Sequence, residues 1–196
     1  ILFAVSMALN VTSIIDAPCG ALVWQEKLLP QLAGNFRGFR YLGLDVSSTV
    51  ITRNRQRLSR LHYASFELAD LAEQPMPLGY ELIFSRDALQ HNTHANVWKI
   101  LWRWAESDAK WVLVGSYPNN NPWCMQGACA SKSATRPAFC NMCGNHDIST
   151  GGYFSIDLAR PPFGLHPTRR YAEVADGEEK HLYLYARASL LAQLRL

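Results

Sequence analysis

"SIIDAPCG" occupies residues 13–20 and marks the point where a short strand turns into a loop. Ile14 and Ile15 are β-branched and favour a strand, which reaches the acidic residue Asp16. Pro18 and Gly20 then interrupt the strand, because proline lacks a donor for the ladder and glycine tolerates backbone angles that other residues avoid. This stretch predicts a buried strand followed by a tight loop, with a carboxylate at the turn.

The same order of strand, acidic residue and helix recurs along the chain. A second strand at 41–45 ends at Asp45, and Ser47 or Ser48 can cap the helix that follows. A third strand at 65–68 runs into Asp70. Two more strands are expected at 80–84 and 110–115, with helices at about 21–32 and 95–106. Strands that alternate with helices predict a mostly parallel sheet covered on both faces.

The alternation stops after the fifth strand. A segment rich in Asn, Cys, Ser and Gly runs from about 118 to 150, far beyond the roughly 4–6 residues of an ordinary connection. Two late strands, 170–174 and 181–187, then flank a hairpin turn. We therefore predict one domain over 1–196: a Rossmann-like, three-layer α/β sandwich whose mostly parallel sheet closes with a C-terminal antiparallel hairpin.

Composition excludes some classes of protein. With 196 residues, of which 48% are hydrophobic, the chain can bury one sizeable core. The net charge is only +3 and the basic residues are dispersed, so nucleic acid is not indicated as a partner. The longest apolar runs, such as 1–9, fall short of the roughly 18 residues that a membrane span needs. We expect a soluble protein, cytoplasmic or organellar.

Three acidic residues at strand ends predict a ligand site. In an open α/β sheet, ligands bind beyond the carboxyl ends of the strands, where Asp16, Asp45 and Asp70 are expected. The carboxylate of Asp45 can accept from both hydroxyls of an adenosine ribose, and Gly20 lets a ligand approach the backbone. A nicotinamide dinucleotide fits less well, because the chain lacks Gly-x-Gly-x-x-Gly and Asp16 would repel a phosphate. The cationic end of S-adenosylmethionine suits Asp16 better.

Several stretches resemble the motifs of class I S-adenosylmethionine-dependent methyltransferases. Residues 16–20, followed by Trp24, resemble the first motif in an Asp-x-Pro-Cys-Gly variant, and 42–45 resemble the second. Residues 66–71 resemble the third motif, and 83–91 carry an Arg-Asp-x-Leu-x-His element similar to the fourth. Shorter likenesses lie at Asn54-Arg55, 151–153 and 161–163. The resemblance covers about 13–187.

The resemblance implies a pocket for S-adenosylmethionine and methyl transfer to an unidentified acceptor. Asp16 and Gly20 would hold the amino-acid end, Asp45 the ribose, and Asp70 with Leu71 the adenine. The implied donor-binding set is completed by Pro18, Cys19, Trp24, Val46, Arg86 and Asp87. One difference from the family is Ala21-Leu22-Val23, where polar residues are expected. The alternative function is therefore an inactive, methyltransferase-like subunit with protein partners in a larger assembly.

The fourth motif also supplies the candidates for catalysis. Gln90 and His91 are placed where such an enzyme meets its acceptor, so His91 could remove a proton from it. An equally open role for His91 is to cap the next helix or to orient Asp87.

Four cysteines cluster in the insertion, spaced C-x4-C-x10-C-x2-C: Cys124, Cys129, Cys140 and Cys143. Four thiolates this close could hold a tetrahedral zinc ion, with His146 able to replace one of them. Two disulfides would cross-link the same loop, and free thiols are the third alternative. Cys19, by contrast, is expected to be a small residue that packs in its loop.

Overall fold

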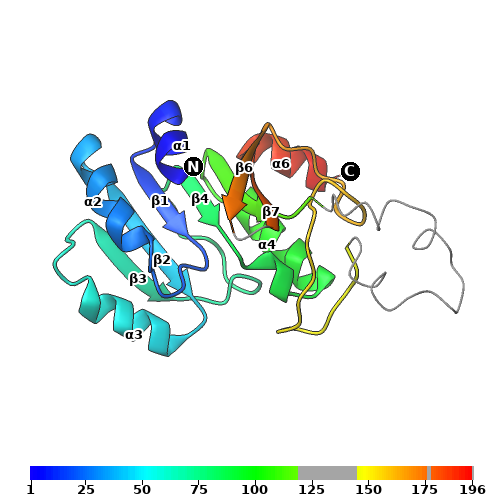
Figure 1. Ribbon diagram of the computed structural model, residues 1–196, viewed down its shortest axis with the longest axis horizontal. Helices are drawn as coiled ribbons and strands as arrows, with labels where there is room; N and C mark the ends of the chain where they lie inside the picture. The colour runs from blue at the N-terminus through cyan, green and yellow to red at the C-terminus, as the bar shows by residue number, and fades with distance from the viewer. Residues whose placement is uncertain (119–144, 176–177, 196) are drawn as a thin grey trace, which may run out of the picture.

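The computed structural model describes residues 1–118, 145–175 and 178–195. Its centre is a seven-stranded sheet in the order β3-β2-β1-β4-β5-β7-β6 (Figure 1). Strands β1 to β5 are parallel, and β7 runs antiparallel to both of its neighbours, β5 and β6. The strands are Ser13–Asp16, Arg40–Asp45, Ala64–Leu68, Leu82–Ser85, Trp111–Ser116, Arg169–Ala175 and Glu178–Ala186, from β1 to β7. The predicted fold class, including the C-terminal antiparallel pair, is confirmed.

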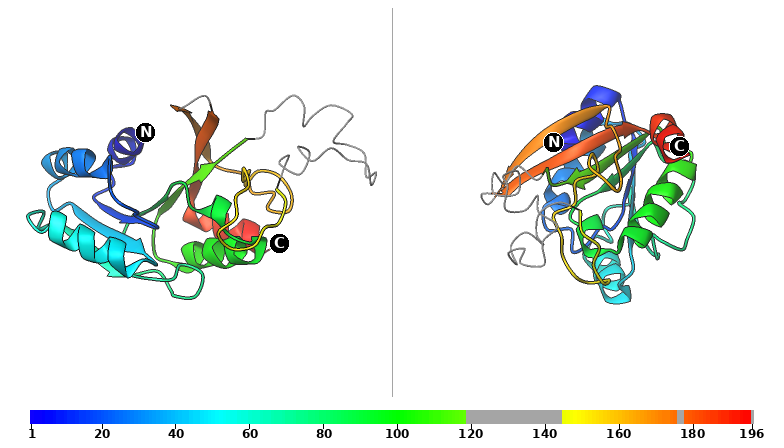
Figure 2. Two further views of the ribbon diagram at one scale, coloured as in Figure 1. Left: turned by 60° about the horizontal axis from the view of Figure 1, so that its bottom comes forward. Right: turned by 90° about the vertical axis from the view of Figure 1, so that its right-hand side faces the viewer.

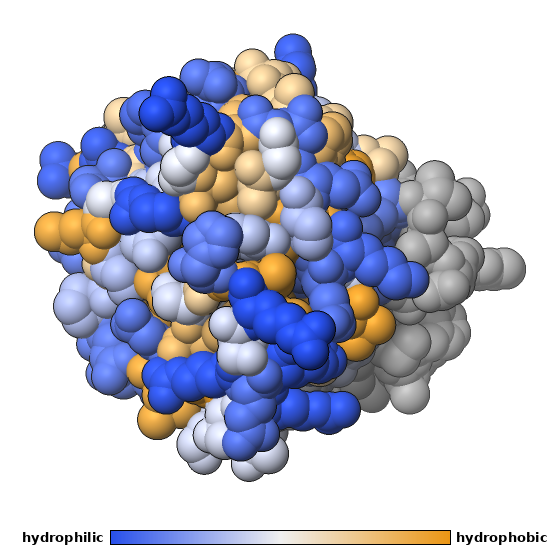
Figure 3. Space-filling model, turned by 90° about the vertical axis from the view of Figure 1, so that its left-hand side faces the viewer, coloured by the Kyte–Doolittle hydropathy of each residue, from blue (hydrophilic) through white to orange (hydrophobic). Residues whose placement is uncertain are grey.

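Helices cover both faces of the sheet (Figure 2). One face packs against α1 (Leu2–Leu9), α2 (Gln25–Asn35) and α3 (Ser48–Arg57). The other packs against α4 (His94–Glu106) and α6 (Arg187–Leu194), and a short 3-10 helix, η1 (Leu89–His91), precedes α4. On the side of the molecule that carries α2 and α3, hydrophilic and apolar side chains are interspersed over the surface (Figure 3).

The two faces divide the core by alternation along each strand. On β1, Ile14 joins the cluster under α1 and α2, whereas Ile15 joins the cluster under α4. On β4, Phe84 and Ile83 divide in the same way. Side chains alternate between faces with a period of two, so a strand buried on both sides must be apolar at every position. This explains why the central strands are continuous apolar runs in the sequence.

The structure differs from the sequence-based elements at three places. Helix α2 begins at Gln25 and not near residue 21, because Gly20 (φ 55°) and Leu22 (φ 56°) adopt left-handed backbone angles that a right-handed helix cannot contain. Helices α1 and α6 were not predicted. At α3 the expectation holds, since the Ser47 hydroxyl accepts the Val50 N–H at 3.3 Å.

The cysteine cluster of the insertion cannot be compared with the structure. Cys124, Cys129, Cys140 and Cys143 lie outside the described residues, so their cross-linking stays a prediction. Within the described ranges, no helix is both long and apolar enough to cross a bilayer.

Candidate functional site

The order of the strands places a switch point between β1 and β4. The chain leaves β1 toward β2 and β3 on one side, and leaves β4 toward β5 on the other, so the two connections separate at the carboxyl ends of these strands. Two hollows of about 250 and 330 Å³ adjoin there, and both are lined by Pro18 and Asp87. The smaller hollow lies over the β1–α2 loop, and the larger one extends past β2 toward α4.

The β1–α2 loop is fixed to β2 and α3 by backbone hydrogen bonds. Gly20 N–H donates to Asp45 Oδ2 at 3.0 Å, and Asn54 Nδ2 donates to the Gly20 carbonyl at 2.8 Å. Cys19 N–H donates to the Leu44 carbonyl at 2.8 Å. Asn54 is fully buried, and it holds the loop from α3. The loop is therefore a rigid edge of the site.

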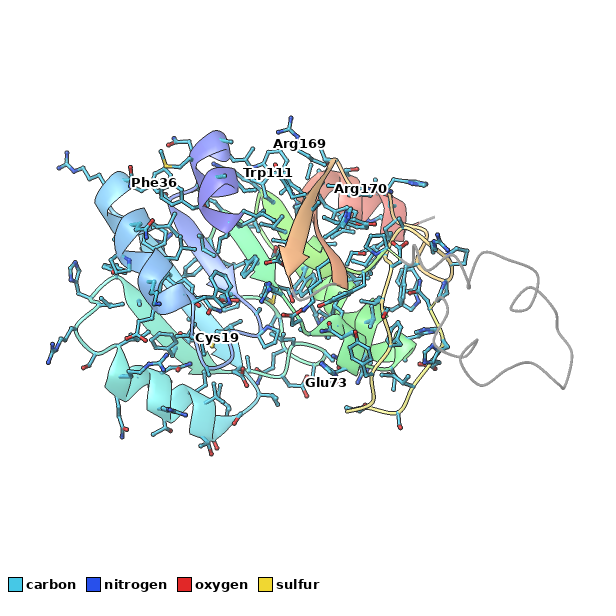
Figure 4. All side chains as sticks on the ribbon, in the orientation of Figure 1. Cys19, Phe36, Glu73, Trp111, Arg169 and Arg170 are labelled. Atoms are coloured by element: carbon cyan, nitrogen blue, oxygen red, sulfur yellow. The ribbon has the colours of Figure 1, made fainter. Side chains whose placement is uncertain are left out.

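A glycine under this loop makes the close packing possible. A Cβ at Gly43 would lie 2.7 Å from Phe66 Cδ1 and 3.0 Å from Cys19 Sγ, closer than side chains tolerate. Cys19 itself is 2% exposed and lies between the strand ends and α3 (Figure 4). Burial raises the pKa of its thiol, which keeps it neutral. These facts agree with a packing role for Cys19.

Asp16 is a buried carboxylate without a cationic partner in the described residues. It is 1% exposed, and its Oδ2 accepts from the Tyr41 hydroxyl at 2.6 Å and from Gln25 Nε2 at 3.1 Å. Burial raises the pKa of Asp16 to about 7, against a usual value of 3.8, even though these two hydrogen bonds oppose the shift. Asp16 lines the smaller hollow.

Asp87, beyond the end of β4, differs from Asp16 in having cationic partners. It forms ion pairs with Arg86 Nη1 at 3.0 Å and with Lys180 Nζ at 3.6 Å, and it accepts from the Tyr117 hydroxyl. Its backbone is left-handed, with φ 57°. Arg86 and Asp87 thus form an ion pair, and both residues line the smaller hollow.

Arg86 is further fixed by two groups from distant parts of the chain. Its Nε donates to Glu173 Oε2 on β6 at 3.0 Å. Its guanidinium lies over the ring of Trp24, 5.9 Å from the centroid. The rings of Trp24 and Phe84 meet nearly at right angles, with 5.8 Å between their centroids. Arg86 and Trp24 therefore form one wall of the smaller hollow.

The residues expected on the adenosine side line the larger hollow, except Asp45. Val46, Asp70 and Leu71 line it, and both Val46 and Asp70 are exposed. Asp45 is only 7% exposed and lines neither hollow. Its two oxygens accept from Gly20 N–H and from Ser47 N–H. The other expected donor-binding residues all line one hollow or the other.

The two candidate catalytic residues differ in access. His91 is exposed at the larger hollow, and its Nδ1 lies 2.9 Å from the Gly152 carbonyl. A proton on Nδ1 would make that hydrogen bond, and Nε2 would then be an acceptor. Gln90 is 4% exposed, and its Nε2 donates to the Tyr117 hydroxyl at 3.2 Å. Gln90 thus contacts Asp87 through Tyr117.

The apolar residues after Gly20 do not close the site. Leu22 is 1% exposed and packs into the core below α2, whereas Val23 is 73% exposed and points away from it. Both border the smaller hollow, which keeps its volume of about 250 Å³. The alternative of an inactive subunit therefore gains no support from these two residues.

Sequence reasoning missed Tyr41 and Gln25, the partners of Asp16. Tyr41 lies on β2, where it pairs in register with Ile14, and Gln25 is the first residue of α2. A polar residue at the start of that helix was a usable signal. Nothing in the local sequence around Tyr41 indicates that its hydroxyl reaches Asp16.

No family model and no curated protein sequence matches the chain. Solved structures do match. The methyltransferase domain of bacterial CtHen1 has a TM-score of 0.62 at 16% identity, covering 94% of this chain and 95% of that one. The N-methyltransferase NodS from Bradyrhizobium japonicum WM9, with S-adenosyl-L-homocysteine, has a TM-score of 0.61 at 16% identity, covering 92% and 82%.

A third similar structure is magnesium protoporphyrin IX methyltransferase from Synechocystis PCC 6803 with bound S-adenosylhomocysteine. Its TM-score is 0.59 at 15% identity, covering 93% of this chain and 78% of that one. At such identities the likeness shows the fold, which is the Rossmann-like fold of class I methyltransferases.

Proposed function

We propose that this chain binds S-adenosylmethionine across the two hollows and transfers its methyl group to an acceptor. The observation that carries the proposal is Asp16, a buried carboxylate that faces a hollow at the switch point and has no cationic partner among the described residues. A carboxylate in such surroundings is costly to ionise. The amino group and the sulfonium of S-adenosylmethionine are both cations, and binding one of them removes that cost.

The lining of the hollows fits the remaining parts of this ligand. Its amino-acid end fits beside Asp16 and Gly20, and its adenosine fits beside Val46 and Asp70. Asp45 keeps lone pairs for the ribose hydroxyls, because a carboxylate offers about four acceptor sites and the structure uses two of them for backbone N–H groups. Similar solved structures contain S-adenosylhomocysteine, which supports the same ligand class here.

A dinucleotide fits the site less well. Its pyrophosphate would lie at the β1–α2 loop, where Asp16 repels it once ionised and only Gly20 of a glycine-rich cradle is present. The methyl donor brings the opposite charge to the same place. The negative charge at this loop therefore favours S-adenosylmethionine over a dinucleotide.

Positioning is the main task of the protein in this reaction. S-adenosylmethionine supplies a methyl group whose bond to sulfur breaks as a lone pair of the acceptor attacks the carbon; the bonding electrons stay on sulfur. The acceptor then loses a proton. Holding the acceptor about 3 Å from the methyl carbon supplies much of the rate enhancement. We assign to Gln90 a positioning role through Tyr117 and Asp87, and to Nε2 of His91 proton removal from an acceptor that reaches the larger hollow.

The proposal also includes a structural cross-link among the four cysteines of the insertion. We expect zinc or two disulfides to join Cys124, Cys129, Cys140 and Cys143, because so polar a segment has little apolar surface with which to order itself. Metal analysis and thiol titration under denaturation separate the cases. Four titrating thiols and no bound metal in freshly isolated protein would contradict this cross-link.

Calorimetry with a matched series of ligands tests the function. We expect S-adenosylmethionine and S-adenosylhomocysteine to bind with dissociation constants on the order of 1–100 μM. 5′-Methylthioadenosine lacks the amino-acid end and should bind at least roughly 100-fold more weakly, because it makes no contact with Asp16. NAD should not bind. The absence of heat with either methyl-donor ligand up to millimolar concentration, in folded protein, contradicts the proposal.

A further inference from the structure

A third hollow, of about 440 Å³, adjoins the site on the side of α1 and α2. Its lining residues include side chains of α1, α2, β4 and β7; Figure 1 shows how these elements are arranged. Phe84 is one residue before the end of β4, and Leu182 on β7 pairs with Gly115 near the end of β5, so the hollow lies close to the carboxyl edge of the sheet. Its apolar lining includes Leu2, Phe3, Trp24, Leu28, Phe84 and Leu182.

This hollow shares a wall with the smaller donor hollow. Trp24 and Arg86 line both of them. The guanidinium of Arg86 is held between Asp87 on the donor side and Glu173 on the far side, and it lies over the Trp24 ring. Methyl transfer requires the acceptor atom about 3 Å from the donor carbon, so the acceptor must occupy space that adjoins the donor. The third hollow adjoins the donor hollow at the wall of Trp24 and Arg86.

The charges at the shared wall balance one another. Arg86 and Lys180 face Asp87 and Glu173, two positive charges against two negative ones. Among the described residues, this wall offers an ionic acceptor no unpaired counterion, and the apolar lining of the hollow does not compensate for the loss of its hydration. The volume is that of a small-molecule site. Apolar lining, balanced charge and volume together favour an uncharged ligand of one or two rings.

We infer that this hollow holds the methyl acceptor, and that the acceptor is a small, uncharged molecule with an apolar body. The inference rests on the proposed function, because an acceptor is defined by its donor. Its nucleophilic atom lies at the wall of Trp24 and Arg86, and its apolar body lies against Leu28, Phe84 and Leu182. Because His91 lines the larger hollow and not this one, an acceptor held here loses its proton to water.

The test uses three probes with the same ring system and different charge. They are 2-naphthol, which is neutral, 2-naphthoate, an anion, and 2-naphthylmethylamine, a cation at neutral pH. Binding to the full chain is measured by saturation-transfer NMR and calorimetry, with saturating S-adenosylhomocysteine. We expect 2-naphthol to bind with a dissociation constant on the order of 1 mM or below. The two ions should bind at least roughly 10-fold more weakly, because each brings an unpaired charge.

A pair of variants locates the binding. Leu28→Trp adds bulk on a half-buried face of α2 that lines the hollow, and Leu61→Trp adds it at a half-buried residue against the same core that does not line the hollow. We expect Leu28→Trp to weaken 2-naphthol binding at least roughly 10-fold and to change the affinity for S-adenosylhomocysteine less than about 2-fold. Leu61→Trp should leave both affinities unchanged.

The outcomes separate this inference from the proposed function. No binding of 2-naphthol, equal binding in Leu28→Trp and the unaltered chain, or tighter binding of either ion overturns the inference, while S-adenosylhomocysteine still binds. A different result is that Leu28→Trp loses 2-naphthol binding while S-adenosylhomocysteine binds to neither the variant nor the unaltered chain. That result overturns the proposed function and the acceptor role. The hollow would then be a site for neutral apolar ligands only.

Discussion

Two carboxylates flank the switch point, and their surroundings are opposite. Asp16, at the end of β1, is 1% exposed and accepts hydrogen bonds from the neutral groups of Tyr41 and Gln25. Asp87, after β4, has a side chain that is 34% exposed and forms ion pairs with Arg86 and Lys180. Burial raises the pKa of Asp16 to about 7. The more buried carboxylate is thus the one without a cation among the described residues.

This contrast indicates different functions. Asp87 has its counterions within the chain, so it holds Arg86 in place and needs no ligand. Ionised Asp16 bears an energetic cost that either a proton or a cation from outside can remove, because the described residues supply no cation. Proteins tolerate such a cost at binding sites. We therefore propose that Asp16 contacts the donor directly, and that Asp87 acts on the donor hollow by holding Arg86 in place.

The largest effect is expected for Asp16→Asn. The amide keeps the shape of the side chain and an acceptor oxygen for Tyr41, but it removes the charge that meets the ligand's cation. We expect the affinity for S-adenosylmethionine to fall at least roughly 100-fold in calorimetry, because a buried charge pair loses one member. The matched control is Asp87→Asn, which should lower the affinity less than about 10-fold and lower the melting temperature instead. Equal losses of affinity in the two variants would remove the distinction between the carboxylates.

The dependence of stability on pH should differ between the same two variants. Unfolded Asp16 loses its proton near pH 3.8 and folded Asp16 near 7, so the folded state holds the extra proton between these values. The free energy of unfolding of the ligand-free chain therefore falls as pH rises from about 4 to 7, by a contribution on the order of 4 kcal/mol from this residue. Asp16→Asn should lose that contribution, and Asp87→Asn should keep it. Urea melts across this range measure it, and parallel curves for Asp16→Asn and the unaltered chain contradict it.

A smaller effect is expected from Gly43→Ala, which pushes the loop around Cys19 away from β2. The added Cβ meets Phe66 and Cys19 at 3.0 Å or less, and we expect a loss of about 1–3 kcal/mol in the free energy of unfolding with a several-fold weaker affinity for the donor. Gly34→Ala is the control, because its Cβ meets no atom within 4 Å inside α2. It should raise stability by about 0.5–1 kcal/mol and leave affinity unchanged. A tolerated Gly43→Ala would show that the loop is not held rigidly.

The smallest effect is expected from Lys180→Gln. Asp87 keeps Arg86 as a counterion, and the lost pair of 3.6 Å involves partly exposed side chains, so the melting measurements should show less than about 1 kcal/mol. Affinity for S-adenosylmethionine should stay within about 2-fold. A loss as large as that of Asp87→Asn would mean that Lys180, and not Arg86, supplies most of the charge that Asp87 needs.

The sequence was sufficient to predict the fold and the acidic strand ends. Apolar runs that stop at Asp16 and Asp45 indicate parallel strands with carboxylates at one edge, and the structure has this arrangement. The neighbours of these carboxylates could not be predicted locally. Tyr41 reaches Asp16 only through the register of β2 on β1, and Glu173 reaches Arg86 across 87 residues of sequence. Helix α2 starts late because Leu22 has a left-handed backbone, which its side chain does not indicate.

The most direct test of the account is the proton balance of donor binding at pH 7. With the pKa of Asp16 near 7, about half of the ligand-free molecules hold the proton, and a bound cation should drive it off. Titration with S-adenosylmethionine in two buffers of different ionisation enthalpy gives the number released. We expect about half a proton per chain for the unaltered protein and for Asp87→Asn, and none for any residual binding by Asp16→Asn. Tight binding without proton release from the unaltered protein would contradict it.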